Sequence, residues 1–280
     1  MKRSHARLIV FFVGLPAIAA LVIALPHFHH IGLNIAISAT MVLGSSEVVG
    51  LFETAGIAVK RSLVVPLTAI VAGASYLRAS EVIGGDVFAA ALLLPFFVIV
   101  IAATVPSSRI DFSGALASAA GSFMAILYPA YFLSFLIRLS GLPRPSISIL
   151  LFLSLVFAND TSAYVFGMFF GKSTRGITPI SPNKSLPGFI AGPLFSVLIA
   201  GIFYWAVPEL FGGKVLVAVA IGIAVGAATV IGDLFESVLK RSAQVKESGG
   251  LIPGRGGVLD SIDSVAFAAP LYFFLITLLG

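Results

Sequence analysis

The sequence predicts an all-α protein, a polytopic bundle of about nine transmembrane helices in a single membrane domain (1–280). Of its 280 residues, 59% are hydrophobic and only 10% are charged, whereas an average soluble domain carries about 25% charged residues. Its apolar residues fall into runs that could cross a hydrocarbon core of about 30 Å, which takes roughly 20 residues per helix. Backbone groups in lipid must be hydrogen-bonded within the segment, so we expect these runs to be helices.

The expected spans follow one another along the whole chain. They cover residues 7–26, 31–52, 62–79, 86–105, 113–137, 146–170, 187–207, 215–239 and 264–279. The first run could be taken for a signal peptide, but it is longer than the apolar core of such a peptide and no clear cleavage site follows it. We expect residues 1–145 to form a scaffold with dimer contacts, and residues 146–280 to carry the catalytic helices and loops.

The distribution of Lys and Arg predicts the orientation in the membrane. If the N-terminus is cytoplasmic, 13 of the 17 Lys and Arg residues fall on the cytoplasmic side and 4 fall outside. This bias is typical of cytoplasmic loops, and it predicts an external C-terminus and insertion in the inner (plasma) membrane. The two most polar connections, residues 171–187 and 240–263, then face the cytoplasm, where a soluble substrate would meet them.

The composition excludes several kinds of site. The chain has no cysteine, so it has no disulfide, thiolate metal site or cysteine nucleophile. Its net charge of +5 comes from basic residues that flank the spans, as in other membrane proteins. Because the sequence has no lysine-rich run, we expect no binding of nucleic acid.

Ionisable residues inside apolar spans are costly, and they are candidates for function by default. Asp160 lies deep in the span 146–170, where it could line a polar cavity, bind a metal or pair with a neighbouring helix. The end of the span 215–239 carries Asp233, Glu236, Ser237 and Lys240. Their spacing places them on one helical face. That face could be a solvated helix end, yet Asp233 lies more than a turn inside the apolar run.

A glycine-rich segment follows, from Val245 to Asp263, and together with the end of the preceding span it forms one polar string from Glu236 to Asp263. Its glycines would let backbone amides approach phosphate groups, and Lys246 and Arg255 would add positive charge. Asp260 and Asp263 stand one helical turn apart at the start of the last helix, a spacing at which two carboxylates can hold a hard cation such as Mg²⁺. A flexible glycine loop that ends in an Asp N-cap would carry the same residues.

The string resembles the signature of the CDP-diacylglycerol synthases, also called phosphatidate cytidylyltransferases. The matching residues are Ser237, Lys240, Arg241, Lys246, Ser248, Gly249, Pro253, Gly254, Gly256, Gly257, Asp260 and Asp263. An upstream segment is similar as well, at Asn159, Asp160, Thr161, Ala163, Tyr164, Gly171, Lys172, Ser181, Pro182, Lys184, Ser185 and Gly188. The sequence departs from the family pattern at Glu247, Arg255, Ser261 and Leu186-Pro187, where the family has Asp, His, Arg and a segment with Glu.

The resemblance implies transfer of the cytidylyl group of CTP to phosphatidate, which gives CDP-diacylglycerol and pyrophosphate for phospholipid synthesis. Such a reaction needs charge neutralisation and alignment more than covalent catalysis. The implied catalytic residues are Asp233, Lys240, Lys246, Asp260 and Asp263. The implied ligands of Mg²⁺ are Asp160, Asp233, Glu247, Asp260 and Asp263. The implied nucleotide-binding residues are Lys172, Ser181, Lys184, Ser237, Arg241, Gly254, Arg255, Gly256 and Gly257.

Three other functions fit parts of the sequence. A CTP-dependent polyprenol or phytol kinase would use the same nucleotide but transfer a phosphoryl group, so the product mass would distinguish it. A secondary transporter could use Asp160 and Asp233 as an ion path, but transporters often carry inverted repeats, and we find none in the sequence. A catalytically inactive relative would be compatible with the four departures.

Two smaller features each have two interpretations. Gly222 and Gly226 form a GxxxG pattern that permits close helix packing, either in a homodimer or within one chain. The family resemblance favours a homodimer. Glu47 and Glu53, in the second expected span, either line the cavity or only mark its cytoplasmic end.

Overall fold

A computed structural model describes residues 15–104, 114–252, 254 and 256–280, and within them the chain is helical and has no β-strand. Eight of the described helical segments are long and apolar enough to cross a membrane: His27–Thr54, Arg61–Ala79, Gly85–Thr104, Ala115–Leu139, Pro145–Phe170, Leu186–Ala206, Val215–Ser242 and Leu259–Leu279. These confirm the predicted polytopic helical bundle. Residues 7–14 of the first expected span, and Arg255, lie outside the described residues.

The described chain divides into two compact units. The first comprises Met1–Pro143 with Leu239–Ser261, and the second comprises Arg144–Val238 with Ile262–Gly280. The boundary between Val238 and Leu239 falls inside helix α10 (Val215–Ser242), and the boundary between Ser261 and Ile262 falls inside helix α11 (Leu259–Leu279). Each of these two helices therefore contributes residues to both units.

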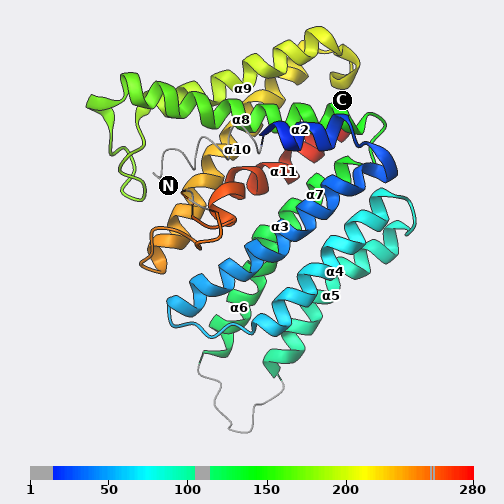
Figure 1. Cartoon of the computed structure of the whole chain (residues 1–280), viewed down its shortest axis with the longest axis vertical. Coiled ribbons are helices and arrows are strands. Elements are labelled where there is room, and N and C mark those ends of the chain that lie inside the picture. The colour runs from blue at the N-terminus through cyan, green and yellow to red at the C-terminus, as the bar shows by residue number, and fades with distance from the viewer. Residues whose placement is uncertain (1–14, 105–113, 253, 255) are drawn as a thin grey trace. The chain divides into compact units, whose positions relative to one another are not determined.

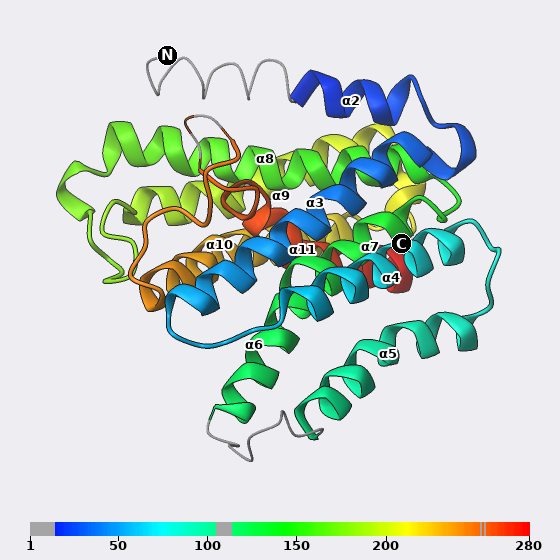
Figure 2. The ribbon, with the colours of Figure 1, turned by 60° about the horizontal axis from the view of Figure 1, so that its bottom comes forward.

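In the first unit, helix α4 (Arg61–Ala79) packs between α3 (His27–Thr54) and α5 (Gly85–Thr104), as Figures 1 and 2 show. The unit also contains α2 (Leu15–Ile23), and α2 and α3 are in contact. A buried hydroxyl pair joins α3 to α4, where Thr68 Oγ1 donates to Ser45 Oγ at 3.0 Å. Both hydroxyls are fully buried between the two helices, so this bond satisfies polar groups that lipid and water cannot reach.

The next span of the first unit is interrupted in its middle. It consists of α6 (Ala115–Ile126), the single π-turn η2 (Leu127–Tyr131) and α7 (Phe132–Leu139). Proline has no backbone N–H and crowds the preceding turn, and Pro129 lies in η2. The proline accounts for the π-turn, because a wider turn accommodates a missing hydrogen bond without ending the helix.

In the second unit, α8 (Pro145–Phe170) and α9 (Leu186–Ala206) lie side by side along their length (Figure 1). The segment between them contains the short 3-10 turn η3 (Lys172–Thr174), and a second one, η4 (Pro208–Phe211), follows α9. Helix α11 packs on α8 through Tyr272, whose hydroxyl donates to the carbonyl of Ser148 at 2.8 Å.

Asn159 joins three helices of the second unit. Its side chain is almost fully buried on α8. Its Nδ2 donates to Ser196 Oγ of α9 at 3.4 Å and to the carbonyl of Gly226 of α10 at 3.0 Å. In an apolar environment such interhelical hydrogen bonds satisfy groups that would otherwise be unpaired. Asn159 therefore fixes the helix that carries the neighbouring residue Asp160.

The GxxxG pattern packs within the chain. A Cβ atom on Gly222 would lie 2.6 Å from Val197 Cα, and one on Gly226 would lie 2.7 Å from Pro193 Cα, both on α9. Glycine at these positions lets the backbones of α9 and α10 approach closely. The interpretation of close packing inside one chain is confirmed for these residues, and a homodimer stays a prediction.

We predict that Gly222→Ala destabilises the protein, because its new methyl group would meet backbone atoms that cannot move independently. Overpacking of this kind costs about 1–3 kcal/mol. Gly201→Ala on α9 is the matched control, since a Cβ atom there meets nothing within 4 Å. The apparent melting temperature in detergent, measured at one scan rate, should fall for Gly222→Ala alone. Equal melting temperatures would contradict the described contact between α9 and α10.

Candidate functional site

The first unit contains a buried ion pair at the glycine-rich string. Lys240 Nζ lies 2.6 Å from Asp260 Oδ1, and the two side chains are only 15% and 7% exposed. Lys240 lies in the last turns of α10, and Asp260 lies in the first turn of α11. The ion pair therefore joins the two ends of the loop formed by residues 243–258, which we call the signature loop.

Asp260 also binds the signature loop through its second oxygen. Asp260 Oδ2 accepts hydrogen bonds from the Ser248 amide at 2.8 Å, the Ser248 hydroxyl at 2.9 Å and the Gly257 amide at 2.8 Å. Asp260 thus fixes the loop at both of its ends, in addition to any role toward a substrate.

A second carboxylate reaches the same loop from the N-terminal part of the chain. Glu47 of α3 accepts the amides of Val258 and Leu259, each at 2.8 Å, and the hydroxyl of Ser248 at 2.9 Å. Glu47 is not among the site residues that the family resemblance implies. The available signal was an acidic residue within an apolar span, but its partners lie more than 200 residues away, and no local spacing indicates them.

The glycines of the signature loop make room for these two carboxylates. A Cβ atom on Gly249 would lie 2.6 Å from Glu47 Oε1, and one on Gly256 would lie 2.6 Å from Asp260 Oδ2. A Cβ atom on Gly257 would collide with both Ser248 Oγ and Glu47 Oε2. Gly254 and Gly256 also have positive φ angles of 77° and 110°, which residues with a Cβ atom rarely adopt.

Two of the amides expected to bind phosphate are engaged within the protein. The Gly257 amide donates to Asp260, and the Gly256 amide donates to the carbonyl of Ile252 at 3.0 Å. A phosphate that bound these amides would have to replace those hydrogen bonds. Phosphate binding by Gly254, Gly256 and Gly257 therefore stays a prediction, and close packing against carboxylates gives a sufficient reason for the glycines at 256 and 257.

The remaining expected residues around the signature loop differ in exposure. Arg241, Lys246 and Glu247 are exposed, whereas Ser237 is half-buried on α10. Arg241 Nη1 donates to the carbonyl of Val245 at 3.3 Å. Because exposed cations are available to an anion from solution, Arg241 and Lys246 are the described residues best suited to meet a polyphosphate here.

The second unit contains a separate group of the expected residues. Lys184 Nζ lies 2.7 Å from Asp233 Oδ2, and the two side chains are 21% and 40% exposed. Ser264 Oγ donates to Asp160 Oδ1 at 3.5 Å, and the Ser264 amide donates to Asp263 Oδ1 at 2.7 Å. The structure therefore pairs Lys184 with Asp233 and connects Asp160 and Asp263 through one serine.

The acidic residues of the second unit lie where three helices meet. A Cβ atom on Gly232, the residue before Asp233, would lie 2.7 Å from the carbonyl oxygen of Asp263. Helices α10 and α11 are therefore in backbone contact next to two of the carboxylates. Asp160 approaches the same crossing from α8 through Ser264.

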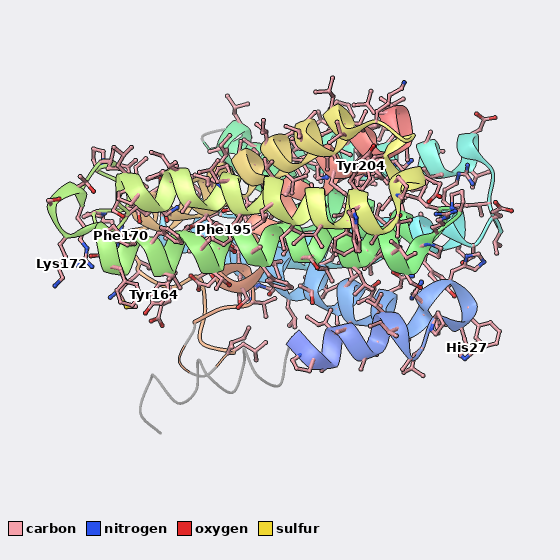
Figure 3. The ribbon with its side chains drawn as sticks, turned by 90° about the horizontal axis from the view of Figure 1, so that it is seen from above. His27, Tyr164, Phe170, Lys172, Phe195 and Tyr204 are labelled. Atoms are coloured by element: carbon pink, nitrogen blue, oxygen red, sulfur yellow. The ribbon has the colours of Figure 1, made fainter. Side chains whose placement is uncertain are left out.

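The segment from Gly171 to Ser185 carries three basic residues, Lys172, Arg175 and Lys184, at one end of the second unit. The beginning and the end of this segment are joined by an isolated antiparallel bridge between Arg175 and Ser185. The Gly176 amide also donates to the carbonyl of Lys184 at 3.1 Å. Ser181 lies in a turn, since its carbonyl accepts the Lys184 amide. Lys172 is exposed just beyond the end of α8, next to Phe170, and Tyr204 marks the other end of the unit (Figure 3).

The acidic residues have the right atom type for Mg²⁺ but are not gathered as a metal site. Mg²⁺ prefers oxygen ligands in octahedral geometry. Among the described residues, no three acidic or imidazole side chains converge closely enough to hold a metal ion. In the first unit, the carboxylates of Glu47 and Asp260 accept protein donors instead. A requirement for Mg²⁺ therefore stays a prediction.

Comparisons with known proteins place the chain in a family. A model of the cytidylyltransferase family matches residues 5–279. The chain is 42% identical over 129 residues to a phosphatidate cytidylyltransferase from Haemophilus influenzae, which covers 44% of each chain. It is 40% identical over 128 residues to one from Synechocystis, which covers 44% of this chain and 41% of the relative.

A relative without an assigned activity is also similar. The uncharacterized protein YnbB of Escherichia coli is 34% identical over 172 residues, which cover 59% of this chain and 56% of that protein. In all three comparisons, the chain spans less than two thirds of the length of the relative that it matches.

We predict that Lys240→Met destabilises the protein, because it removes the cation from a carboxylate that is 7% exposed. Breaking one side of a buried ion pair costs about 3–5 kcal/mol. Lys246→Met removes an exposed cation from the same loop and is the control. The measurement is the free energy of unfolding in mixed micelles with increasing SDS. Loss of less than about 1 kcal/mol, as expected of a surface pair, would contradict the described burial.

Proposed function

The chain belongs to the cytidylyltransferase family, and from that premise we propose that it transfers the cytidylyl group of CTP to phosphatidate. The products would be CDP-diacylglycerol and pyrophosphate. The observation that carries this proposal is the signature loop, in which Asp260, Lys240 and Glu47 hold a cation-bearing loop to membrane helices. Relatives named phosphatidate cytidylyltransferase support the choice of substrates.

The proposed reaction is an in-line displacement at phosphorus. A phosphate oxygen of phosphatidate attacks the α-phosphorus of CTP, and the bond from that phosphorus to the oxygen bridging to the β-phosphate breaks. Pyrophosphate leaves with the electron pair. Because the transition state spreads negative charge over phosphoryl oxygens, fixed positive charges accelerate the step. We assign Arg241 and Lys246 to binding of the triphosphate. Arg255 is added to them on the family resemblance alone.

Lys240 has a different proposed role from the exposed cations. Its ammonium group already pairs with Asp260 at 2.6 Å, so its first function is to hold the loop. Lys172 and Lys184 are cations of the second unit that we also assign to phosphate groups. Lys184 pairs with Asp233 in this structure, and a bound phosphate would compete with that carboxylate for the ammonium group.

We also propose a requirement for Mg²⁺, which would enter with CTP. Mg²⁺ usually binds one or two carboxylates together with substrate phosphates and waters, so three converging carboxylates are not needed. Asp233 and Asp263 are the carboxylates that we assign to it, with Asp160, Glu247 and Asp260 as the other acidic residues implied by the resemblance. When bound, the ion would neutralise charge on the triphosphate.

The substrates suggest where the protein works. CTP is soluble and phosphatidate is anchored in lipid, so the reaction must take place close to a membrane surface. We propose that the signature loop and the segment 171–185 face the cytoplasm, in agreement with the distribution of Lys and Arg along the chain.

The reaction is tested with CTP labelled in either its α- or its γ-phosphate. Purified protein in detergent should move the α-label, and not the γ-label, into a lipid whose mass is that of CDP-diacylglycerol. The reaction should stop when EDTA removes Mg²⁺ and recover when Mg²⁺ is restored. Transfer of the γ-label would identify a lipid kinase. No transfer from folded protein that binds CTP would overturn the proposed reaction.

We predict that Asp233→Asn lowers the turnover number by about 10²-fold or more, because a group preorganised toward a charged transition state is worth that much. Glu209→Gln is the control, since Glu209 pairs with Arg144 at 3.1 Å on the surface of the same unit. The measurement is initial rate at saturating CTP, with folded protein quantified by gel filtration. An unchanged rate in Asp233→Asn would remove this residue from the catalytic set.

A further inference from the structure

Glu47 is bound to the signature loop by three hydrogen bonds, although it belongs to α3 in the N-terminal part of the chain. We propose that Glu47 is a positioning residue. It holds the start of α11 and the signature loop in one conformation, and through them it determines where Asp260 and Lys240 lie. The effect on catalysis rests on the proposed function, whereas the effect on the loop does not.

The geometry favours a carboxylate at position 47. Glu47 Oε1 accepts the Val258 amide and Oε2 accepts the Leu259 amide, both at 2.8 Å. These amides stand at the start of α11, where the first N–H groups of a helix have no partner within it. A negative charge at this end is also favoured by the helix dipole. Glu47 thus supplies an acceptor oxygen for each of the two amides and a negative charge at the N-terminus of α11.

Ser248 connects Glu47 to the ion pair of the loop. Its hydroxyl oxygen lies 2.9 Å from a carboxylate oxygen of Glu47 and 2.9 Å from one of Asp260. A hydroxyl has one proton, so it can donate to only one of the two carboxylates at a time. Ser248 nevertheless contacts both carboxylates, and Asp260 pairs with Lys240. A change at Glu47 should therefore alter the position of Ser248, of Asp260 and of the Lys240 ammonium group.

The glycines of the loop provide an independent observation. Gly249 and Gly257 leave no room for a Cβ atom because the Glu47 carboxylate occupies that space. The loop is therefore fitted around this side chain on two sides. A residue that only ended a helix at the membrane surface would not need two glycines packed against its carboxylate.

The first test measures amide hydrogen exchange across residues 245–260 of the full chain in detergent. Glu47→Gln retains one acceptor oxygen but turns an NH₂ group toward one of the two amides. We expect exchange at Val258 and Leu259 to become about tenfold to a hundredfold faster, as for loss of hydrogen bonds to a charged group. Glu53→Gln is the control, since Glu53 pairs with Arg61 at the surface of the same helix. Unchanged exchange in Glu47→Gln would overturn the proposal.

The second test separates positioning from folding. Glu47→Gln should lower kcat for cytidylyl transfer by about tenfold or more with a smaller change in KM for CTP, and Glu47→Asp should restore part of the rate. Ser248→Ala should lower kcat while Val258 and Leu259 keep their slow exchange, because their bonds to Glu47 remain. An unchanged kcat in Ser248→Ala would show that the Ser248 hydroxyl does not carry the effect of Glu47 to Asp260, and unchanged kcat in both Ser248→Ala and Glu47→Gln would overturn the catalytic part of the proposal.

A third variant serves if Glu47→Gln does not fold. Gly257→Ala removes no hydrogen-bonding group, but its methyl group would displace the Glu47 carboxylate, so the same acceleration of exchange is expected. Slow exchange in Gly257→Ala would contradict the described packing. The exchange measurements need no turnover, so failure of the proposed reaction and failure of the role of Glu47 can be distinguished.

Discussion

A carboxylate in a membrane protein must find hydrogen-bond donors, because lipid supplies none. Asp260 finds one ammonium group, two amides and one hydroxyl, and Glu47 finds two amides and the same hydroxyl. These donors come from the signature loop and the helix ends beside it. The conformation of the loop, its glycines and the position of Lys240 all depend on supplying these two half-buried acids with donors.

The membrane-spanning architecture could be predicted from the sequence because it follows from composition. An apolar run of about 20 residues forms a helix in lipid, because its backbone groups must be hydrogen-bonded within the segment. The described residues contain eight of the nine expected spans. The boundaries were less accurate. Helix α11 begins at Leu259, five residues before the expected span, because Glu47 and Asp260 stabilise a polar helical start that hydropathy does not reveal.

The candidate site could be predicted only in part. Spacing within one segment indicated the face of α10 and the two aspartates of α11, and the structure places Lys240 and Asp260 in contact. Pairing between distant segments could not be derived, as with Glu47 and Ser248, which are 201 residues apart. Binding of phosphate by the glycines stays a prediction. No pattern in the sequence indicates that the Glu47 carboxylate fills the space next to Gly249 and Gly257.

We propose that the signature loop, held by Glu47 and Asp260, receives CTP. Hydrogen exchange of the full protein with and without CTP and Mg²⁺ tests it most directly, because it reports where the nucleotide binds without requiring turnover. If the loop receives CTP, exchange should become slower in residues 240–260 and 171–185 and should not change in the connection 207–214. Protection of residues 207–214, or none anywhere at saturating CTP, would contradict the claim.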